Sequence, residues 1–210
     1  MYRNWIKRLI DIVVSLMALP LVALVIVIMT PIIYMNDRGP VFYNAPRRGK
    51  DGKVFKMYKF RSMYVNSPDL KNVDGSTFNG ADDPRVTKVG RFMRKTSIDE
   101  IPQILNVLTG DMSFVGPRPT LATVSYDQLT DLKKKRLKVR PGITGYAQAY
   151  YRNSITQDEK FNLDYFYVDN FCFWMDIKIM LKTIQSVLKR ENIYVSMNEE
   201  TKRKVNGSQK

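Results

Sequence analysis

The stretch TSIDEIPQILNVLTGDMSFVGPRP, from Thr96 to Pro119, combines an adjacent acid pair, an amphipathic segment and a Gly-Pro-Arg-Pro corner. Apolar residues recur within it at the i, i+3, i+4, i+7 spacing of a helix face, namely Ile101, Ile104, Leu105 and Leu108. We therefore expect a short helix with this apolar face buried. Gly110 is expected to end the helix, because glycine readily adopts the left-handed conformation of a helix C-terminus.

Two helix registers are open for the acid pair, Asp99 and Glu100. Ser97 and Glu100 fit a capping box, but this register puts Pro102 beyond the free amides of the first turn, where it costs a hydrogen bond. If Asp99 is the cap instead, Pro102 falls among amides that are free anyway. In both registers the carboxylates lie at a helix N-terminus, whose dipole favours their ionised form. An ionised Asp99 is a candidate nucleophile, and plain helix capping is the simpler interpretation.

Composition narrows the chemistry that one domain of 210 residues can perform. Its 34 Lys and Arg against 20 Asp and Glu give a formal charge of +14, which predicts an anionic partner. Nucleic acid, lipid headgroups and a phosphorylated substrate are all anionic, so the charge alone does not choose among them. The chain has no histidine, which excludes a Ser-His-Asp triad and any His-ligated metal. Its single cysteine, Cys172, excludes an internal disulfide and fits a reducing compartment.

An uncharged run, IVVSLMALPLVALVIVIMTPIIYM, extends from Ile12 to Met35. As a helix it is long enough to cross a bilayer core of about 30 Å, so residues 1–36 are predicted to enter a membrane. The run is too long for a signal peptide, and no small-residue cleavage site follows it. A nucleic-acid binder would explain the positive charge and the aromatic residues, but it would not explain this segment.

Basic residues flank the apolar run on both sides, and positive charge is retained on the cytoplasmic side of a membrane. They are Arg3, Lys7 and Arg8 before it, and Arg38, Arg47, Arg48, Lys50, Lys53, Lys56 and Lys59 after it. A helix that enters the bilayer and returns on the same face satisfies both flanks, and Pro20 can supply the kink. We therefore favour a re-entrant helix over a spanning one. Pro31 is expected to end the segment.

A β-hairpin is predicted next, because residues 41–47 and 53–60 are rich in strand-forming side chains and Gly49 to Gly52 lie between them. Lys59 and Arg61 follow at alternate positions, hence on one face of a strand, which is either a phosphate-binding face or a solvated edge. The composition of residues 66–84 predicts a loop. In that loop Asp82 and Asp83 precede a proline and are read as turn residues rather than metal ligands.

Cations converge on the acid pair from both sides in the sequence. Arg91 and Arg94 precede it within residues 85–95, and Arg118 follows between two prolines. Because the prolines fix the backbone, the guanidinium of Arg118 is aimed with little entropy to lose, as bidentate phosphate capture requires. A rigid turn with its arginine in solvent is the alternative.

These residues resemble the bacterial sugar transferase family, the monotopic phosphoglycosyl transferases, and in particular its small members made of the catalytic domain alone. The resemblance extends from Lys7-Arg8 to about Tyr194. The motifs that carry it are Lys59-Phe60-Arg61-Ser62-Met63, Ser97-Ile98-Asp99-Glu100, Leu105-Asn106-Val107, Gly110-Asp111-Met112-Ser113, Gly116-Pro117-Arg118-Pro119 and Arg140-Pro141-Gly142-Ile143-Thr144-Gly145.

The resemblance implies a two-step phosphoryl transfer from a UDP-sugar to polyprenol (undecaprenyl) phosphate, which starts assembly of a cell-surface glycan. Asp99 would attack the sugar-bearing phosphorus and release UMP, leaving an aspartyl phosphosugar. Glu100 would bind Mg²⁺ and assist deprotonation of the acceptor. Lys59, Arg94 and Arg118 would hold phosphate oxygens together with Arg61, and Arg140 would line the nucleotide side of the pocket. The implied location is the bacterial inner membrane with the active site on its cytosolic face, and a homodimer is compatible with it.

This chain departs from the family pattern in two places. The family's membrane helix often breaks at a Ser-Pro about one turn after Pro20, where this chain has Ala23-Leu24. Small members also commonly carry Asn-Gly-Arg-Asn where this chain has Tyr150-Tyr151-Arg152-Asn153. The resemblance therefore does not identify which UDP-sugar this chain uses as donor.

Residues 125–138 are predicted to be helical, with the basic run 133–136 forming a solvated face or a contact to anionic lipid. An apolar stripe opposite Lys178, Lys182 and Lys189 fits either an interfacial helix or core packing. The stripe consists of Phe171, Phe173, Trp174, Ile177, Met180, Leu181, Ile184 and Leu188.

Together these features predict an α+β, mainly helical fold. We expect a membrane-inserted helix in residues 1–36, a catalytic domain in residues 37–195 with a small β-hairpin and interfacial amphipathic helices, and a polar flexible tail in residues 196–210. The rival function is a non-catalytic basic scaffold at the membrane surface, which leaves the acid pair and Arg118 without a purpose.

Overall fold

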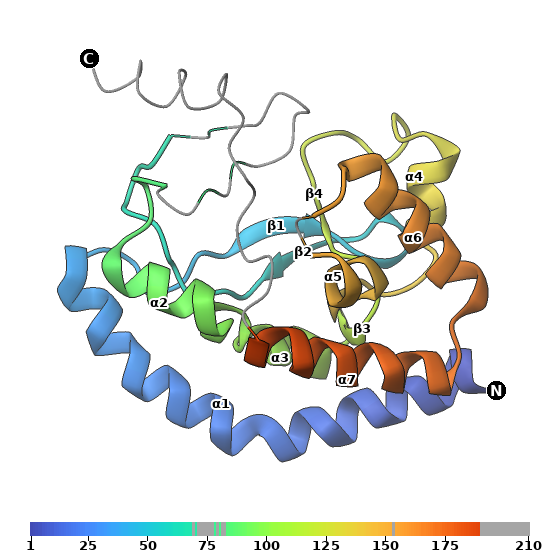
Figure 1. Cartoon of the computed structure of the whole chain (residues 1–210), viewed down its shortest axis with the longest axis horizontal. Helices are drawn as coiled ribbons and strands as arrows, with labels where there is room; N and C mark the ends of the chain where they lie inside the picture. The colour runs from blue at the N-terminus through green and yellow to red at the C-terminus, as the bar shows by residue number, and fades with distance from the viewer. Residues whose placement is uncertain (69, 71–77, 79, 81–82, 153, 190–210) are drawn as a thin grey trace.

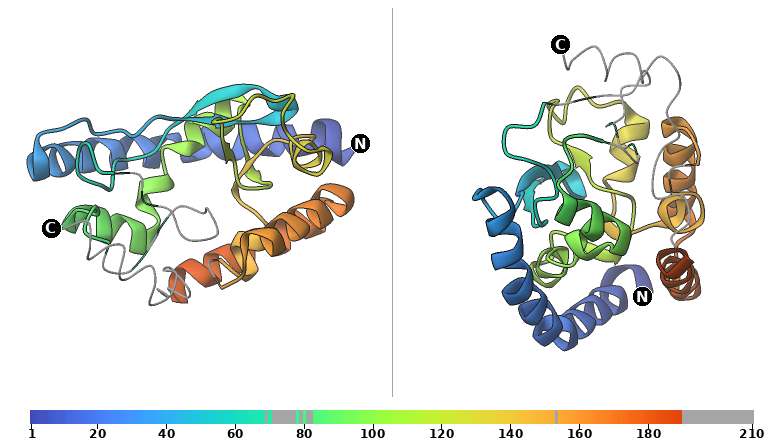
Figure 2. Two further views of the ribbon diagram at one scale, coloured as in Figure 1. Left: turned by 90° about the horizontal axis from the view of Figure 1, so that it is seen from above. Right: turned by 60° about the vertical axis from the view of Figure 1, so that its left-hand side comes forward.

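The computed structural model describes residues 1–68, 70, 78, 80, 83–152 and 154–189, and the predicted tail, 196–210, lies outside them. The fold is α+β and mainly helical, as predicted. A long helix, α1 (Lys7–Asp37), follows a π-helical turn (Tyr2–Ile6) and curves beneath the remaining elements (Figure 1). Figure 2 shows α1 along one long side of the molecule and the two C-terminal helices along the other.

Helix α1 is continuous through both of its prolines, Pro20 and Pro31, and changes direction along its length (Figure 1). The expectation that Pro31 ends the segment is wrong, since the helix ends six residues later at Asp37 and is followed by Arg38, which has a left-handed φ of 52°. Proline is the usual cause of a sharp bend in a helix. In the described part of the chain, α1 alone is long and apolar enough to cross a membrane, and only 17% of its most apolar window is buried.

The predicted hairpin is confirmed. Strands β1 (Ala45–Arg48) and β2 (Val54–Met57) pair antiparallel around a 3₁₀ turn (Lys50–Gly52). Strand β4 (Thr120–Leu121) adds to the other edge of β1, so the sheet order is β2-β1-β4. A second sheet consists of β3 (Ser113–Val115) and β5 (Gly142–Thr144), which pair in parallel. The β1–β4 pairing brings the chain just after Arg118 beside the hairpin.

The acid pair lies in a connection between two helices. Helix α2 (Lys88–Thr96) is followed by a 3₁₀ turn (Ile98–Glu100) and then by α3 (Gln103–Thr109). Neither predicted cap forms, because Ser97 has a left-handed φ of 58° and α3 begins only after Pro102. The proline therefore sits where no intrahelical hydrogen bond is lost. Gly110 ends α3 with a φ of 94°, as predicted.

The buried face of α3 differs from the predicted one. Its buried residues are Gln103, Asn106 and Val107, while the predicted face, Ile101, Ile104, Leu105 and Leu108, is only partly buried. The Asn106 side chain accepts a hydrogen bond from the Tyr58 amide (2.8 Å) and donates one to the Lys56 carbonyl (2.8 Å). The amide thus satisfies backbone groups of the hairpin, which apolar periodicity does not reveal.

The C-terminal helices are α4 (Asp131–Arg136), α5 (Tyr146–Tyr150), α6 (Gln157–Asn170) and α7 (Phe173–Lys189). The predicted helix over 125–138 is shorter, because Thr130 caps α4 by accepting from the Lys133 amide. Its basic run is also not one solvated face. Arg136 is buried against Asp164 (2.6 Å), and Lys135 pairs with Asp169 (2.6 Å).

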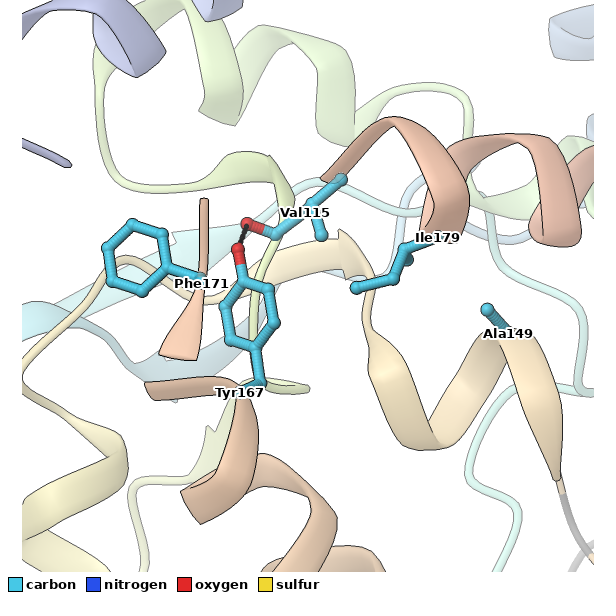
Figure 3. Packing of buried hydrophobic residues seen from close by; sticks show 5 residues of the cluster. All are labelled: Val115, Ala149, Tyr167, Phe171 and Ile179. Carbon is cyan, nitrogen blue, oxygen red and sulfur yellow. Dashed lines mark hydrogen bonds between the residues drawn. The ribbon is translucent and has the colours of Figure 1, made fainter. Parts of the chain in front are cut away.

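One core cluster joins the parallel sheet to α5, α6 and α7. It consists of Val115, Ala149, Tyr167, Phe171 and Ile179 (Figure 3). The Tyr167 hydroxyl donates to the Val115 carbonyl (3.2 Å), as Figure 3 shows, and also lies 2.7 Å from a carboxylate oxygen of Asp176. Burial, together with that neighbouring carboxylate, raises the pKa of Tyr167.

Helix α7 buries a narrow face made of Asp176, Ile179 and Ser186. Of the predicted apolar stripe, only Phe171 belongs to the core, while Ile177 and Met180 are half-buried. The rest of the stripe is exposed to solvent, namely Phe173, Trp174, Leu181, Ile184 and Leu188. Core packing therefore does not account for the stripe.

Candidate active site

The acid pair is held against residues 59–61 after the hairpin, which form an isolated bridge between Phe42 and Phe60 and not the predicted strand. The Phe60 amide donates a hydrogen bond to the Asp99 carbonyl (3.0 Å), which fixes the 3₁₀ turn beside residues 59–61. Asp99 is buried, with 3% of its surface exposed, whereas Glu100 is partly open to solvent. One carboxylate therefore faces the protein interior and its neighbour faces outward.

Lys59 binds both carboxylates. Its Nζ lies 2.8 Å from Asp99 Oδ2 and 3.2 Å from Glu100 Oε1. Burial alone would lower the pKa of Lys59, but attraction to Asp99 and Glu100 outweighs it and raises that pKa. Burial likewise disfavours the ionised form of Glu100, but the positive charges of Lys59 and Arg118 outweigh it and lower the pKa of Glu100. The lysine ammonium and the Glu100 carboxylate are therefore both charged at neutral pH.

Two of the predicted phosphate-binding arginines lie near this group. Arg118 Nη2 is 3.6 Å from Glu100 Oε1, and 58% of its side chain is exposed, so most of the guanidinium remains open to a ligand. Arg94, in the last turn of α2, donates from Nε to the Ser62 hydroxyl (2.9 Å). Because Ser62 lies three residues after Lys59, this hydrogen bond holds Arg94 against the segment that carries Lys59.

The other predicted residues lie elsewhere. Arg61 does not share a face with Lys59, because it is buried and pairs with Asp37 at the end of α1. Arg140 donates from Nε to the Gly110 carbonyl (2.8 Å), at the end of α3 opposite to the acid pair. Asp83 is buried in an ion pair with Arg85 (2.8 Å), as a structural role predicts. Asp82 lies outside the described residues.

Sequence reasoning missed one arginine, Arg47. It sits on β1, and the β1–β4 register pairs it with Leu121, three residues after Arg118. Burial lowers the pKa of Arg47, and repulsion by the nearby Arg118 lowers it further. Within the described part of the chain, its buried Nε has no hydrogen-bond partner. Two guanidinium groups close enough to repel each other form an arrangement that suits an anion, and only the long-range β1–β4 pairing reveals it.

The acid pair is also compatible with the Mg²⁺ that the family resemblance implies, for which Glu100 is the expected ligand. Mg²⁺ is usually held by one or two carboxylates, with water and substrate phosphates completing its coordination. Asp99 and Glu100 provide two such groups, and Glu100 is the more exposed. No cluster of three or more acidic or cysteine ligands exists among the residues that the structure describes.

The residues brought together define a class of site: adjacent carboxylates neutralised by a lysine, with two arginines open to an anionic ligand beside them. Comparison with known proteins places this site in a family. The family model described as "Bacterial sugar transferase" matches residues 2–190. The chain belongs to the bacterial sugar transferase family.

Three relatives illustrate the similarity. The chain is 43% identical over 190 residues to the galactosyl transferase CpsE of Streptococcus agalactiae, covering 87% of this chain and 42% of the relative. It is 42% identical to the uncharacterized sugar transferase EpsL of Bacillus subtilis, covering 90% of both chains. It is 41% identical to the undecaprenyl-phosphate galactose phosphotransferase of Salmonella typhimurium, covering 91% of this chain and 42% of the relative. The chain thus spans about two fifths of the first and third relatives and nearly all of the second.

Proposed function

We propose that this protein transfers a sugar phosphate from a UDP-sugar to undecaprenyl phosphate, the first step in building a cell-surface glycan. An oxygen of the Asp99 carboxylate forms a bond to the β-phosphorus of the UDP-sugar. The bond from that phosphorus to the bridging oxygen breaks, and UMP leaves with the electron pair. A phosphate oxygen of the polyprenol phosphate then attacks the same phosphorus and expels the Asp99 carboxylate. The product is a polyprenyl diphosphate-sugar.

The observation that carries this proposal is the Lys59 bridge to both carboxylates, with Arg118 and Arg47 beside it. Phosphoryl transfer depends mainly on positioned cations that offset the negative charge of the transferring group. The Lys59 ammonium lies 2.8 Å from Asp99, where it can orient this carboxylate as a nucleophile. The exposed guanidinium of Arg118 and the positive charge of Arg47 near it are suited to hold the diphosphate.

Glu100 is proposed to hold Mg²⁺. When bound, the ion would neutralise charge on the diphosphate oxygens. The partly exposed, ionised carboxylate of Glu100 can also accept a proton from the incoming acceptor phosphate.

Both ends of α1 are anchored to the same globular body, which supports a re-entrant helix. Near its start, Arg8 donates to the carbonyls of Val107 (2.5 Å) and Leu108 (2.8 Å). At its other end, Asp37 pairs with Arg61. A helix that crossed the bilayer would place these ends on opposite faces, about 30 Å apart. We therefore propose that α1 dips into the bacterial inner membrane and returns, with the acid pair on the cytosolic side.

The topology has a direct test. Cysteines introduced near each end of the chain, in a Cys172→Ser background, are probed with a membrane-impermeant thiol reagent in sealed vesicles. A re-entrant helix predicts that both cysteines are equally labelled by, or equally protected from, the reagent. Labelling of only one of them from a given side would show that the helix spans the membrane.

UMP release tests the reaction itself. Purified protein in detergent is incubated with Mg²⁺, undecaprenyl phosphate and a panel of UDP-hexoses and their N-acetylated counterparts. The panel is broad because Tyr150 and Tyr151 stand where small members of the family commonly carry Asn-Gly, so the family pattern does not identify the sugar. We expect UMP from at least one donor, and its loss in Asp99→Asn but not in Asp51→Asn, an exposed aspartate outside the site. No UMP from any donor would favour the scaffold function.

A further inference from the structure

A second basic site lies at the other end of α3, away from the acid pair. It is a cavity of about 390 Å³ between the start of α1, the segment 138–140 and the end of α6. Six of its lining side chains are cationic, and two are carboxylates, Asp11 and Asp169. The cations are Arg3, Lys7, Arg8, Lys50, Lys138 and Arg140. The proposed reaction uses none of them.

Part of this positive charge is not neutralised by the protein. Asp169 is committed to Lys135 (2.6 Å), Lys7 is paired with Asp176 (2.5 Å), and Lys50 lies 4.0 Å from Asp51 at the surface. Asp11 accepts hydrogen bonds from the Ser113 hydroxyl and the Phe114 amide. In the described residues, no carboxylate lies within ion-pair distance of Arg8, Lys138 or Arg140, since the arginines donate only to neutral backbone carbonyls. A cavity with this lining favours an anion that can accept several hydrogen bonds at once.

The arginines are held in place from one side. Arg8 donates to Val107 and Leu108, and Arg140 donates to Gly110, so both guanidinium groups gather at the C-terminal end of α3. The negative end of the helix dipole makes that position favourable for cations. Capping of α3 explains why the arginines are there. It does not explain Lys50 and Lys138, which line the same cavity and for which no hydrogen bond to α3 is found among the described residues.

The cavity lies at the level where lipid headgroups are expected if α1 enters the membrane as proposed. Three of its six cations, Arg3, Lys7 and Arg8, come from the turns immediately before the uncharged run that begins at Ile12. The same turns expose Trp5 and Leu9, and Trp174 is exposed three residues after Phe171, which lines the cavity. Exposed tryptophan beside cations is typical of the membrane interface.

We infer that this cavity binds the phosphate of an anionic phospholipid headgroup and so holds the start of α1 at the membrane surface. The inference rests on the proposed membrane insertion, but not on the chemistry at Asp99. A free phosphate ion offers the same oxygens without the acyl chains, so the experiment must separate the two sources.

The test uses the full chain in an uncharged detergent. Native mass spectrometry follows its titration with dioleoyl-phosphatidylglycerol, with dioleoyl-phosphatidylcholine and with inorganic phosphate. The variant is Lys50→Gln/Lys138→Gln, because both lysines are exposed and neither side chain bonds to a backbone carbonyl of the described residues. The contact of Lys50 to Asp51 (4.0 Å) lies at the surface and contributes little. The matched control is Lys53→Gln/Lys133→Gln, which removes the same charge from exposed positions outside the cavity.

We expect one saturable phosphatidylglycerol per chain and no comparable site for phosphatidylcholine. The cavity variant should bind phosphatidylglycerol on the order of thirtyfold more weakly, since each cation near a headgroup contributes about a fivefold change in affinity. The control should match the wild type. Equal weakening in both variants, or binding of inorganic phosphate without phosphatidylglycerol, would overturn the inference. UMP release is measured on the same samples, so failure of the proposed reaction is detected separately from failure of lipid binding.

Discussion

Replacing Lys59 with Met tests the electrostatic arrangement of the site most sharply. The substitution keeps most of the side-chain volume but removes the ammonium that binds both carboxylates. Asp99 and Glu100 are then left as adjacent negative charges, with Asp99 buried. Arg118 remains 3.6 Å from Glu100, but its side chain is largely in solvent and compensates little.

The expected loss follows from burial and distance. Removing one partner of a buried ion pair costs about 3–5 kcal/mol, and we expect the lower end because 19% of the Lys59 side chain is exposed. For a chain of this size, about 3 kcal/mol lowers the unfolding temperature by roughly 6–12 °C.

Thermal unfolding in detergent, followed by tryptophan fluorescence at pH 7, measures the shift. Lys56→Met is the matched control, since Lys56 is exposed on the same hairpin. Lys59→Arg should recover most of the loss by restoring the charge. If Lys59→Met unfolded at the temperature of the control, the acids would not depend on Lys59 and our account of the site would be wrong.

Three further predictions follow from the geometry. Arg47→Gln should raise the KM for the UDP-sugar about tenfold or more, because Arg47 is proposed to donate charged hydrogen bonds to the diphosphate. Lys53→Gln should leave the KM unchanged. Steady-state kinetics measures both values, and an unchanged KM in Arg47→Gln would show that Arg47 does not bind the substrate. The folded-state pKa of Glu100 lies below 4.5, so its ionised form stabilises the fold above that pH and the benefit is lost as the pH falls through the folded value. The unfolding temperature of Glu100→Gln should therefore respond less to acidification than that of the wild type, and identical slopes would contradict this. Asp83→Ala should lower the free energy of unfolding by about 3–5 kcal/mol because it leaves the buried Arg85 without its carboxylate partner. Asp51→Asn should be nearly neutral in the same unfolding assay, since asparagine tolerates the left-handed φ of 54° at this exposed position.

The parts of the fold that follow from local pattern were predictable. The apolar run gives α1, and the glycines between two strand-forming segments give the hairpin. Gly110 ends α3 because its backbone conformation is local. The buried face of α3 was not predictable in this way, since Asn106 is buried to bond Tyr58 and Lys56, some fifty positions earlier in the chain.

The site shows the same division between local and long-range information. The acid pair, Lys59 and Arg118 stand out by residue type and meet in the structure. Arg61 also stands out, but its partner is Asp37, which the sequence pattern does not connect to it. Arg47 comes beside Arg118 only because β4 pairs with β1. Residue type thus indicated the chemistry, and strand pairing decided which cations take part in it.

Covalent trapping tests the central claim most directly. The full chain is incubated with Mg²⁺ and its productive UDP-sugar, carrying ³²P at the β-phosphate, in the absence of undecaprenyl phosphate. The protein is then denatured, digested and mapped. We predict label on the peptide that contains Asp99, none in Asp99→Asn, and release of the label when undecaprenyl phosphate is added before denaturation. Undiminished label on Asp99→Asn would show that Asp99 is not the nucleophile.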